Sequence, residues 1–105
     1  MPRSLLIVHV HIHVKAECVN AFLDATRANA ENSRREPGVL RFDVIAQRDD
    51  STRYVLVEIY RDEAAAAAHK QTAHYAAWRD VATDMMAEPR TSARYVNVSP
   101  DDGDW

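Results

Sequence analysis

Three residues between positions 58 and 74 have side chains that can move protons. Glu58 is a carboxylic acid inside a run of β-forming residues, and His69 and His74 follow it five residues apart. A charged side chain within a strand is costly unless it has a partner or a task. A buried acid opposite two imidazoles suits proton transfer at neutral pH. We therefore predict that Glu58, His69 and His74 are catalytic, provided that the fold brings them together.

The hydrophobic periodicity predicts the elements that must position these residues. Alternation of apolar residues indicates strands, three- and four-residue steps indicate helices, and Pro-Gly and Asp-Asp-Ser mark turns. Asp62 and Thr72 are good N-caps for two short helices. The predicted elements are a strand over 5–14, a helix over 16–36, strands over 40–48 and 54–60, helices over 64–68 and from 72 to before Pro89, and a strand over 90–98.

The order β-α-β-β-α-α-β predicts an α+β, ferredoxin-like fold with a four-stranded antiparallel sheet. The helices can cover only one face of this sheet, and the strands place apolar residues on both faces. We therefore expect a homodimer that forms through the open sheet face. Residues 1–98 form a single predicted domain, and the acidic residues 99–105 form a flexible tail, which Trp105 could anchor on a neighbour.

Helix phase and strand parity add further candidates for the site. Asn29 and Ser33 share one helical stripe with Phe22, so all three should face the sheet. A buried Asn29 can donate to an oxyanion or orient a carbonyl, although it can also be purely structural. Glu58 has a structural alternative too, a salt bridge with Arg41 or Arg94.

Several stretches together resemble the antibiotic biosynthesis monooxygenase family. The resemblance spans about residues 19–98. It rests on Asn29-Ala30, Ser33, Glu36-Pro37-Gly38-Val39-Leu40-Arg41-Phe42-Asp43-Val44, Tyr54, Glu58-Ile59-Tyr60-Arg61-Asp62, His69-Lys70, His74-Tyr75 and Trp78. Membership implies a dimeric α+β barrel. Within the family the sequence is most similar to quinol monooxygenases and to autoinducer-2-degrading isomerases, which share a scaffold but differ in reaction.

The composition excludes several classes of function. The net charge is −3 and no basic cluster is present, so we expect no nucleic-acid partner. No apolar run is long enough to span a bilayer, so we expect no membrane partner. The single cysteine, Cys18, indicates a reducing compartment and a cytoplasmic protein. Motifs for dinucleotides, phosphate loops or zinc are missing, so we expect no cofactor.

The first strand carries a separate group of histidines. His9, His11 and His13 alternate along one face, about 6.6 Å apart. Two such histidines can bind zinc when a third ligand is available, but no cysteine is spaced to help. We therefore expect no metal site and interpret this row as a polar surface that faces the dimer partner.

We expect an enzyme that acts on a small molecule, a cofactor-free monooxygenase of a phenol or quinol. In this hypothesis His69 or His74, supported by Glu58, removes a proton, and the anion reacts with O₂ while Asn29 and Tyr54 hold the negative oxygen. The remaining expected substrate contacts are Phe42, Ser33, Tyr75 and Trp78. The alternatives are an isomerase of a small hydroxy-ketone, with Lys70 or Arg79 binding any phosphate, and a non-catalytic dimeric ligand-binding module.

Overall fold

The computed structural model describes residues 5–105, so the first four residues of the predicted domain lie outside it. The main elements are β1 (Leu6–His13), α1 (Val19–Ser33), β2 (Val39–Gln47), β3 (Asp50–Tyr60), α2 (Glu63–His69), α3 (Ala73–Ala82) and β4 (Thr91–Tyr95). Three short 3-10 segments accompany them: η1 (Ala16–Cys18), η2 (Thr83–Met85) and η3 (Asp102–Asp104). The predicted order of strands and helices is confirmed, and the fold is α+β and ferredoxin-like.

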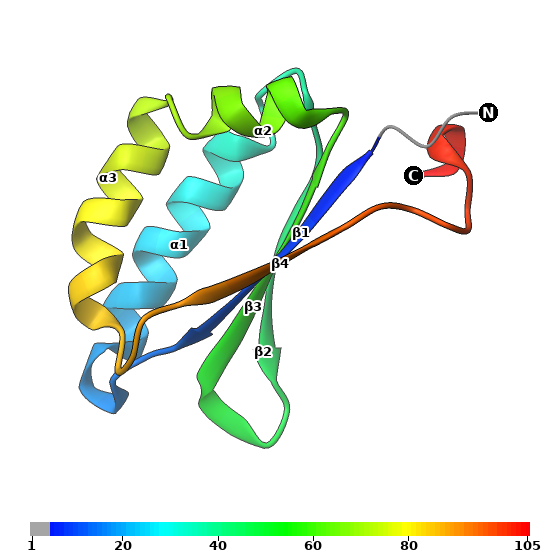
Figure 1. Ribbon diagram of the computed structural model, residues 1–105. Coiled ribbons are helices and arrows are strands. Elements are labelled where there is room, and N and C mark those ends of the chain that lie inside the picture. Colours follow the sequence, from blue (N-terminus) through cyan, green and yellow to red (C-terminus); the bar gives the residue numbers. More distant parts are fainter. Residues whose placement is uncertain (1–4) are drawn as a thin grey trace.

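The four strands form one antiparallel sheet in the order β2-β3-β1-β4, and the helices lie over a single face of it (Figure 1). β3 is an inner strand between β1 and β2. Glu58 on β3 is level with Val8 on β1 and with Phe42 on β2. Glu58, which we predict to be catalytic, therefore extends from an inner strand of the sheet, on the face that the helices cover.

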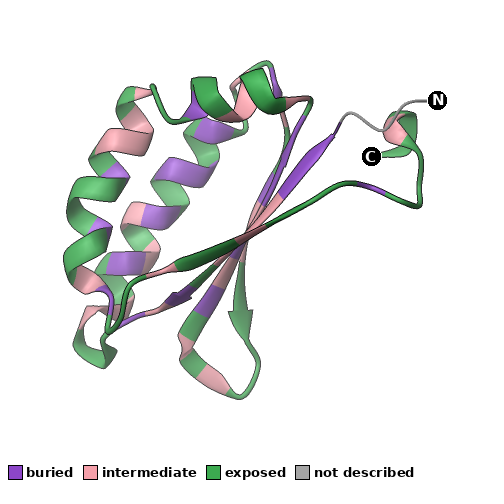
Figure 2. Ribbon diagram, in the orientation of Figure 1, coloured by how far each residue is buried: buried purple, intermediate pink, exposed green. Residues whose placement is uncertain are grey.

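The main core fills the space between this face and the helices. Its largest members include Phe22, Phe42, Leu56 and Trp78, all at most 4% exposed. Figure 2 shows buried residues recurring along one side of α1. Each fully buried side chain of this size contributes about 1.5–3 kcal/mol. Trp78 Nε1 also donates a 3.0 Å hydrogen bond to Thr26 Oγ1, which ties α3 to α1.

Both predicted N-caps are confirmed. The Ala65 N–H donates to Asp62 Oδ1 at 2.8 Å at the start of α2, and the Tyr75 N–H donates to Thr72 Oγ1 at 3.2 Å at the start of α3. Each cap satisfies a backbone donor that the helix itself leaves free. These caps fix where α2 and α3 begin, and so fix the chain positions from which His69 and His74 extend.

The first helix is shorter than predicted, and the difference matters for the site. α1 ends at Ser33, and Glu36 lies in the following turn, where its N–H donates to the Ser33 carbonyl at 3.1 Å. Pro37 has no N–H and restricts the residue before it, so the helix cannot continue through this point. Glu36 thereby leaves the surface of α1.

Two side chains depart from the orientation that their spacing in the sequence suggests. Alternation groups Leu40 with Phe42 and Val44 on one face of the strand. Val39 pairs with Tyr60 while Arg41 pairs with Ile59, which leaves Leu40 as the extra residue of a bulge and 48% exposed. By its spacing from Trp78 and Met85, Val81 should face inward from α3. It is 46% exposed because its neighbour Ala82 occupies the buried position.

The sheet face opposite the helices carries the histidine row. His11 is exposed, His13 lies 3.4 Å from Glu88, and the His9 ring packs against the Tyr95 ring in a tilted arrangement. Ile45 and Tyr95 on this face are 50% and 47% exposed. This is the face through which a homodimer was predicted. Dimerisation stays a prediction.

The C-terminal residues beyond β4 extend away from the helices and end in a compact turn (Figure 1). Asn97 is 1% exposed and donates to Asp102 Oδ1 at 2.7 Å, and Trp105 Nε1 donates to the Pro100 carbonyl at 2.9 Å. Trp105 thus anchors the tail on its own chain here, and the flexibility of residues 99–105 stays a prediction. None of the helices in residues 5–105 has the length and apolar character needed to cross a membrane.

Candidate active site

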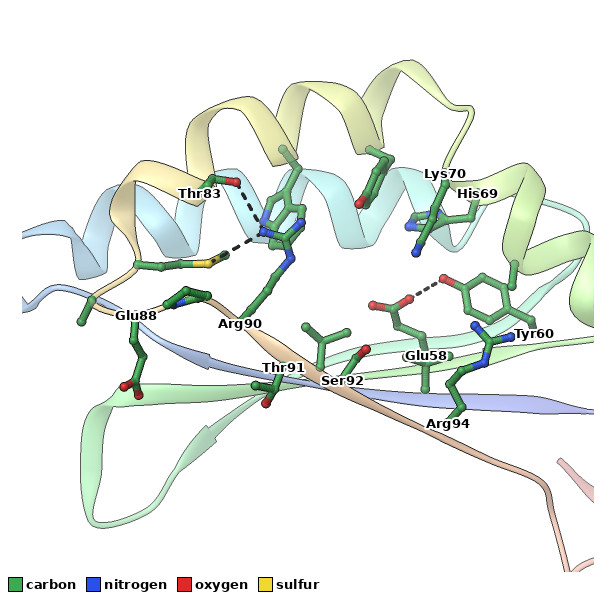
Figure 3. Close-up of a pocket in the computed structure, with 18 residues that line it drawn as sticks. Glu58, Tyr60, His69, Lys70, Thr83, Glu88, Arg90, Thr91, Ser92 and Arg94 are labelled. Atoms are coloured by element: carbon green, nitrogen blue, oxygen red, sulfur yellow. Dashed lines mark hydrogen bonds between the residues drawn. The ribbon is translucent and has the colours of Figure 1, made fainter.

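A cavity of about 620 Å³ lies between the sheet and the helices α2 and α3 (Figure 3). Its volume suits a small organic molecule, since ligand pockets of proteins measure about 300–1,000 Å³. Val8 and Val10 of β1 and Trp78 of α3 supply apolar walls. The titratable groups on the walls are Glu58, Tyr60, His69, Lys70, Tyr75, Glu88, Arg90 and Arg94.

Glu58 is the acid at the centre of this cavity. The residue is 8% exposed, and the Tyr60 hydroxyl donates a short hydrogen bond to Glu58 Oε1. Burial raises the pKa of Glu58, and the hydrogen bond from Tyr60 and the nearby His69 and Lys70 oppose this shift only in part. A carboxyl group with a raised pKa exchanges protons more readily near neutral pH than an exposed one.

Tyr60 serves as the fixed donor to that carboxyl group. Burial is the largest cause that raises the pKa of Tyr60, followed by the negative charge of Glu58. The phenol therefore keeps its proton over the ordinary pH range and donates a hydrogen bond to Glu58. The two predicted salt-bridge partners of Glu58 are engaged elsewhere: Arg41 binds Asp43 at 2.6 Å, and Arg94 binds Glu63 at 2.5 Å.

The two predicted histidines do meet, but through an acid that the sequence analysis did not select. Glu36 Oε2 lies 2.8 Å from His69 Nδ1 and 2.7 Å from His74 Nε2. His69 is 3% exposed and lines the cavity, whereas His74 is not among the lining residues. Glu36 was placed at the end of a helix, and only the Pro-Gly pair after it signalled that the chain turns there.

The remaining predicted site residues divide into two groups. Tyr75 and Trp78 line the cavity beside His69 and Glu58. Asn29, Ser33, Phe42 and Tyr54 lie elsewhere: the Ser33 hydroxyl donates to the Asn29 carbonyl at 2.6 Å within α1, the Phe42 ring lies 5.6 Å from the His69 ring, and Tyr54 borders a different hollow beside α1. The catalytic and substrate-binding roles assigned to these residues stay predictions.

The cavity also holds cations that lack an acidic partner in residues 5–105. Lys70 makes no ion pair there, and in Figure 3 it stands across the cavity from Glu58. Arg90 lies 5.2 Å over the Trp78 ring, and its other polar contacts are with Thr83 Oγ1 and Met86 Sδ. Arg79, the other cation considered for a phosphate, instead contacts Asp80 outside the cavity. Lys70 and Arg90 are therefore free to bind an anion.

Among residues 5–105, Glu36, His69 and His74 form a group of side chains that could hold a metal ion. Their ligand atoms lie within 4.8 Å of one another, and one carboxylate with two imidazoles is a common zinc ligand set. The contacts of 2.7 and 2.8 Å are hydrogen-bond distances. Ligand atoms bound to zinc at about 2.0–2.1 Å in a tetrahedron would stand farther apart. The arrangement fits a hydrogen-bonded network better than a metal site.

These features define a class: a ferredoxin-like α+β protein with a cavity of small-molecule size, in which a buried acid faces a histidine held by a second acid. Comparison with known proteins specifies the family. The model of the antibiotic biosynthesis monooxygenase family matches residues 5–81, so the chain belongs to this family, as the resemblance predicted.

Solved structures agree with this assignment. A protein from Nitrosomonas europaea, named for the same family, superposes with a TM-score of 0.92 at 46% identity, over 96% of this chain and 97% of that one. Curated relatives add a reaction. An isomerase of (4S)-4-hydroxy-5-phosphonooxypentane-2,3-dione from Klebsiella pneumoniae is 42% identical over 87% of this chain and 93% of its own length. Its counterpart from Yersinia enterocolitica is 41% identical over 87% and 95%.

These relatives correct the predicted reaction. Monooxygenase was our main interpretation, and the similarity to several isomerases at 37–42% identity contradicts it. The error has a clear origin: both reactions begin with removal of a proton from the substrate, so the same acid and histidines suit either. The comparisons support an enzyme and favour the isomerase alternative.

Proposed function

We propose that this protein is an isomerase of a small phosphorylated hydroxy-dione, the substrate class for which its curated relatives are named. In such a molecule the carbon that bears the hydroxyl group is next to a carbonyl, so its hydrogen is acidic. Moving this hydrogen to the carbonyl carbon exchanges the hydroxyl and the ketone. The reaction consumes no oxidant and releases no group, so it needs only groups that take and return protons.

The observation that supports this proposal most is the position of Glu58. Its carboxyl group is buried, points into the cavity and is held by Tyr60. In the proposed mechanism the Glu58 carboxylate takes the proton from the hydroxyl-bearing carbon, and the electrons of that bond form an enediolate. The protonated Glu58 then returns the proton to the neighbouring carbon.

The enediolate carries negative charge on oxygen, which needs a compensating group. Lys70 lines the same cavity and lies close enough to Glu58 to influence its pKa. We assign Lys70 to the developing oxyanion, because a positive charge placed beside the forming negative oxygen stabilises it. Arg90, at the end of the cavity near Thr83, is assigned to the phosphate, because a guanidinium group binds phosphate with two parallel hydrogen bonds.

The test is to incubate the purified protein with (4S)-4-hydroxy-5-phosphonooxypentane-2,3-dione and to follow the isomer by NMR. Deuterium on the hydroxyl-bearing carbon should slow turnover by a primary isotope effect, because that bond breaks in the proposed step. Glu58→Gln should abolish conversion, whereas Glu17→Gln, a change at an exposed acid of η1, should not. Absence of conversion by the wild type, or full activity of Glu58→Gln, would refute the proposal.

A further inference from the structure

Glu36 contacts both of the histidines that the sequence analysis selected. Its Oε2 atom receives two contacts, one from His69 of α2 and one from His74 of α3. Glu36 itself is largely covered, with 14% of its side chain exposed. It lies outside the cavity lining, so it does not meet the substrate directly. Any influence on the reaction passes through a histidine.

The chemistry of a carboxylate fixes where the histidine protons are. An ionised carboxylate accepts hydrogen bonds and donates none. The His69 Nδ1 and His74 Nε2 atoms that contact Glu36 must therefore both carry hydrogen. For a neutral imidazole, a hydrogen on Nδ1 leaves Nε2 with a free lone pair. His69 is thus held in the form that has an acceptor on its other side.

That acceptor is available to the cavity. No residue in the range 5–105 makes a hydrogen bond to His69 Nε2. Among side-chain atoms of these residues, only Asn97 Oδ1 is both fully buried and without a partner. His69 Nε2 therefore retains some access to open space, and the space that this side chain lines is the cavity.

The surroundings also limit rotation of the His69 ring. The rings of Phe42, Tyr60 and Tyr75 lie 5.6, 5.8 and 5.3 Å from it, centre to centre. Turning the ring over would exchange Nδ1 for a carbon and break the contact with Glu36. Packing and hydrogen bonding thus favour the same orientation.

We infer that Glu36 is a positioning residue that holds His69 with hydrogen on Nδ1, so that Nε2 can accept a proton from the substrate hydroxyl. This inference rests on the proposed isomerase function. As Glu58 moves the carbon-bound proton, His69 Nε2 takes the hydroxyl proton and delivers it to the neighbouring oxygen. One O–H bond breaks and another forms, the bond between this hydrogen and Nε2 exists only in between, and the protein ends unchanged. Glu36 acts on this step without touching the substrate.

The experiment combines NMR with kinetics on three forms of the full chain: wild type, Glu36→Gln, and Glu31→Gln as the matched control. Glu31 is an exposed acid on the same helix that Glu36 follows. Long-range ¹H–¹⁵N spectra at a pH where histidines are neutral distinguish nitrogen with hydrogen from nitrogen without it. In the wild type and in Glu31→Gln we expect hydrogen on Nδ1 of His69 and on Nε2 of His74. In Glu36→Gln the His69 preference should weaken, because the neutral amide is a poorer acceptor than a carboxylate and also presents a donor.

The kinetic result separates positioning from packing. Glu36→Gln should lower kcat by roughly 10²-fold, the scale of one misplaced acid–base group, with little change in KM. Hydrogen on Nε2 of His69 in the wild type would overturn the inference, as would unchanged kcat in Glu36→Gln. If His69 has the expected form but the wild type converts no hydroxy-dione, the proposed reaction fails while the positioning by Glu36 stands.

Discussion

Replacement of Gly38 by alanine tests how closely α2 must pack for the site to form. Gly38 is buried immediately before β2, and its carbonyl accepts a 2.8 Å hydrogen bond from the Arg61 N–H. A Cβ atom at position 38 would overlap the Cβ of Ala65 on α2 and lie 3.4 Å from the Ala65 Cα. Carbon atoms in proteins normally approach to about 3.5–4.0 Å. The backbone must therefore move.

The free-energy cost of this substitution depends on how far the backbone at position 38 and helix α2 can move apart. Overpacking of this kind costs about 1–3 kcal/mol, and the loss of glycine freedom in the unfolded chain returns about 0.4–1 kcal/mol. We expect Gly38→Ala to lower the free energy of unfolding by about 1–2 kcal/mol, and Tm by roughly 5–15 °C. Ala65 is one helical turn before His69, so the shift should also stretch the 2.8 Å contact of His69 with Glu36 and lower kcat.

The assay is urea unfolding of Gly38→Ala, Ala65→Gly and the double variant. Ala65→Gly alone should cost about 1 kcal/mol, the usual penalty for glycine within a helix. The double variant should cost about as much as Ala65→Gly alone, because the missing methyl group makes room for the added one. Additive costs, or a Gly38→Ala protein as stable as the wild type, would refute the reasoning that Gly38 is required by this contact.

Three further predictions concern the cavity and the core. Burial raises the pKa of Glu58 above its ordinary value of 4.5, so the wild type should lose stability relative to Glu58→Gln as pH rises through 4.5 and beyond. Urea unfolding midpoints of the two proteins at several pH values measure this difference, and the opposite trend would contradict the prediction. Arg90→Met should raise KM for the phosphorylated substrate at least about 10-fold, since a charge-assisted hydrogen bond is worth about 1.5–3 kcal/mol. KM for the dephosphorylated analogue should stay nearly unchanged. Equal effects on the KM values of the two compounds would exclude a phosphate contact. Thr26→Val should destabilise the fold by about 1–3 kcal/mol, because the Trp78 N–H loses its buried acceptor, and calorimetry should detect the change.

The arrangement of elements could be read from the sequence because it depends on local patterns. The period-2 alternation in β1, the caps at Asp62 and Thr72, and the Pro37-Gly38 break each identify an element from a few neighbouring residues. Strand parity also groups Glu58 with Tyr54 and Tyr60 on one face of β3. The structure shows that the helices cover this face, where Glu58 is 8% exposed. The exposure of Leu40 could not be predicted from alternation, because a bulge depends on the partner strand and not on the local pattern.

The contacts of Glu36 with the two histidines could not be predicted from the sequence for a similar reason. Glu36 and His69 are 33 residues apart, and Glu36 and His74 are 38 apart. Their contact depends on where α1 ends and on how α2 and α3 pack over the sheet. The sequence supplied the two histidines but assigned their partner as Glu58. In the folded chain Glu58 accepts a hydrogen bond from Tyr60, and both histidines contact Glu36.

The sequence by itself therefore determined the fold and the three residues that could move protons, because alternation, capping and residue type are local properties of the chain. The tertiary structure decided which of these groups meet. Burial separates the roles of the two acids: Glu58 faces the cavity with a raised pKa, while Glu36 sits behind His69. Distances and desolvation arise only when segments distant in the chain pack together, and for this reason no local pattern could reveal them.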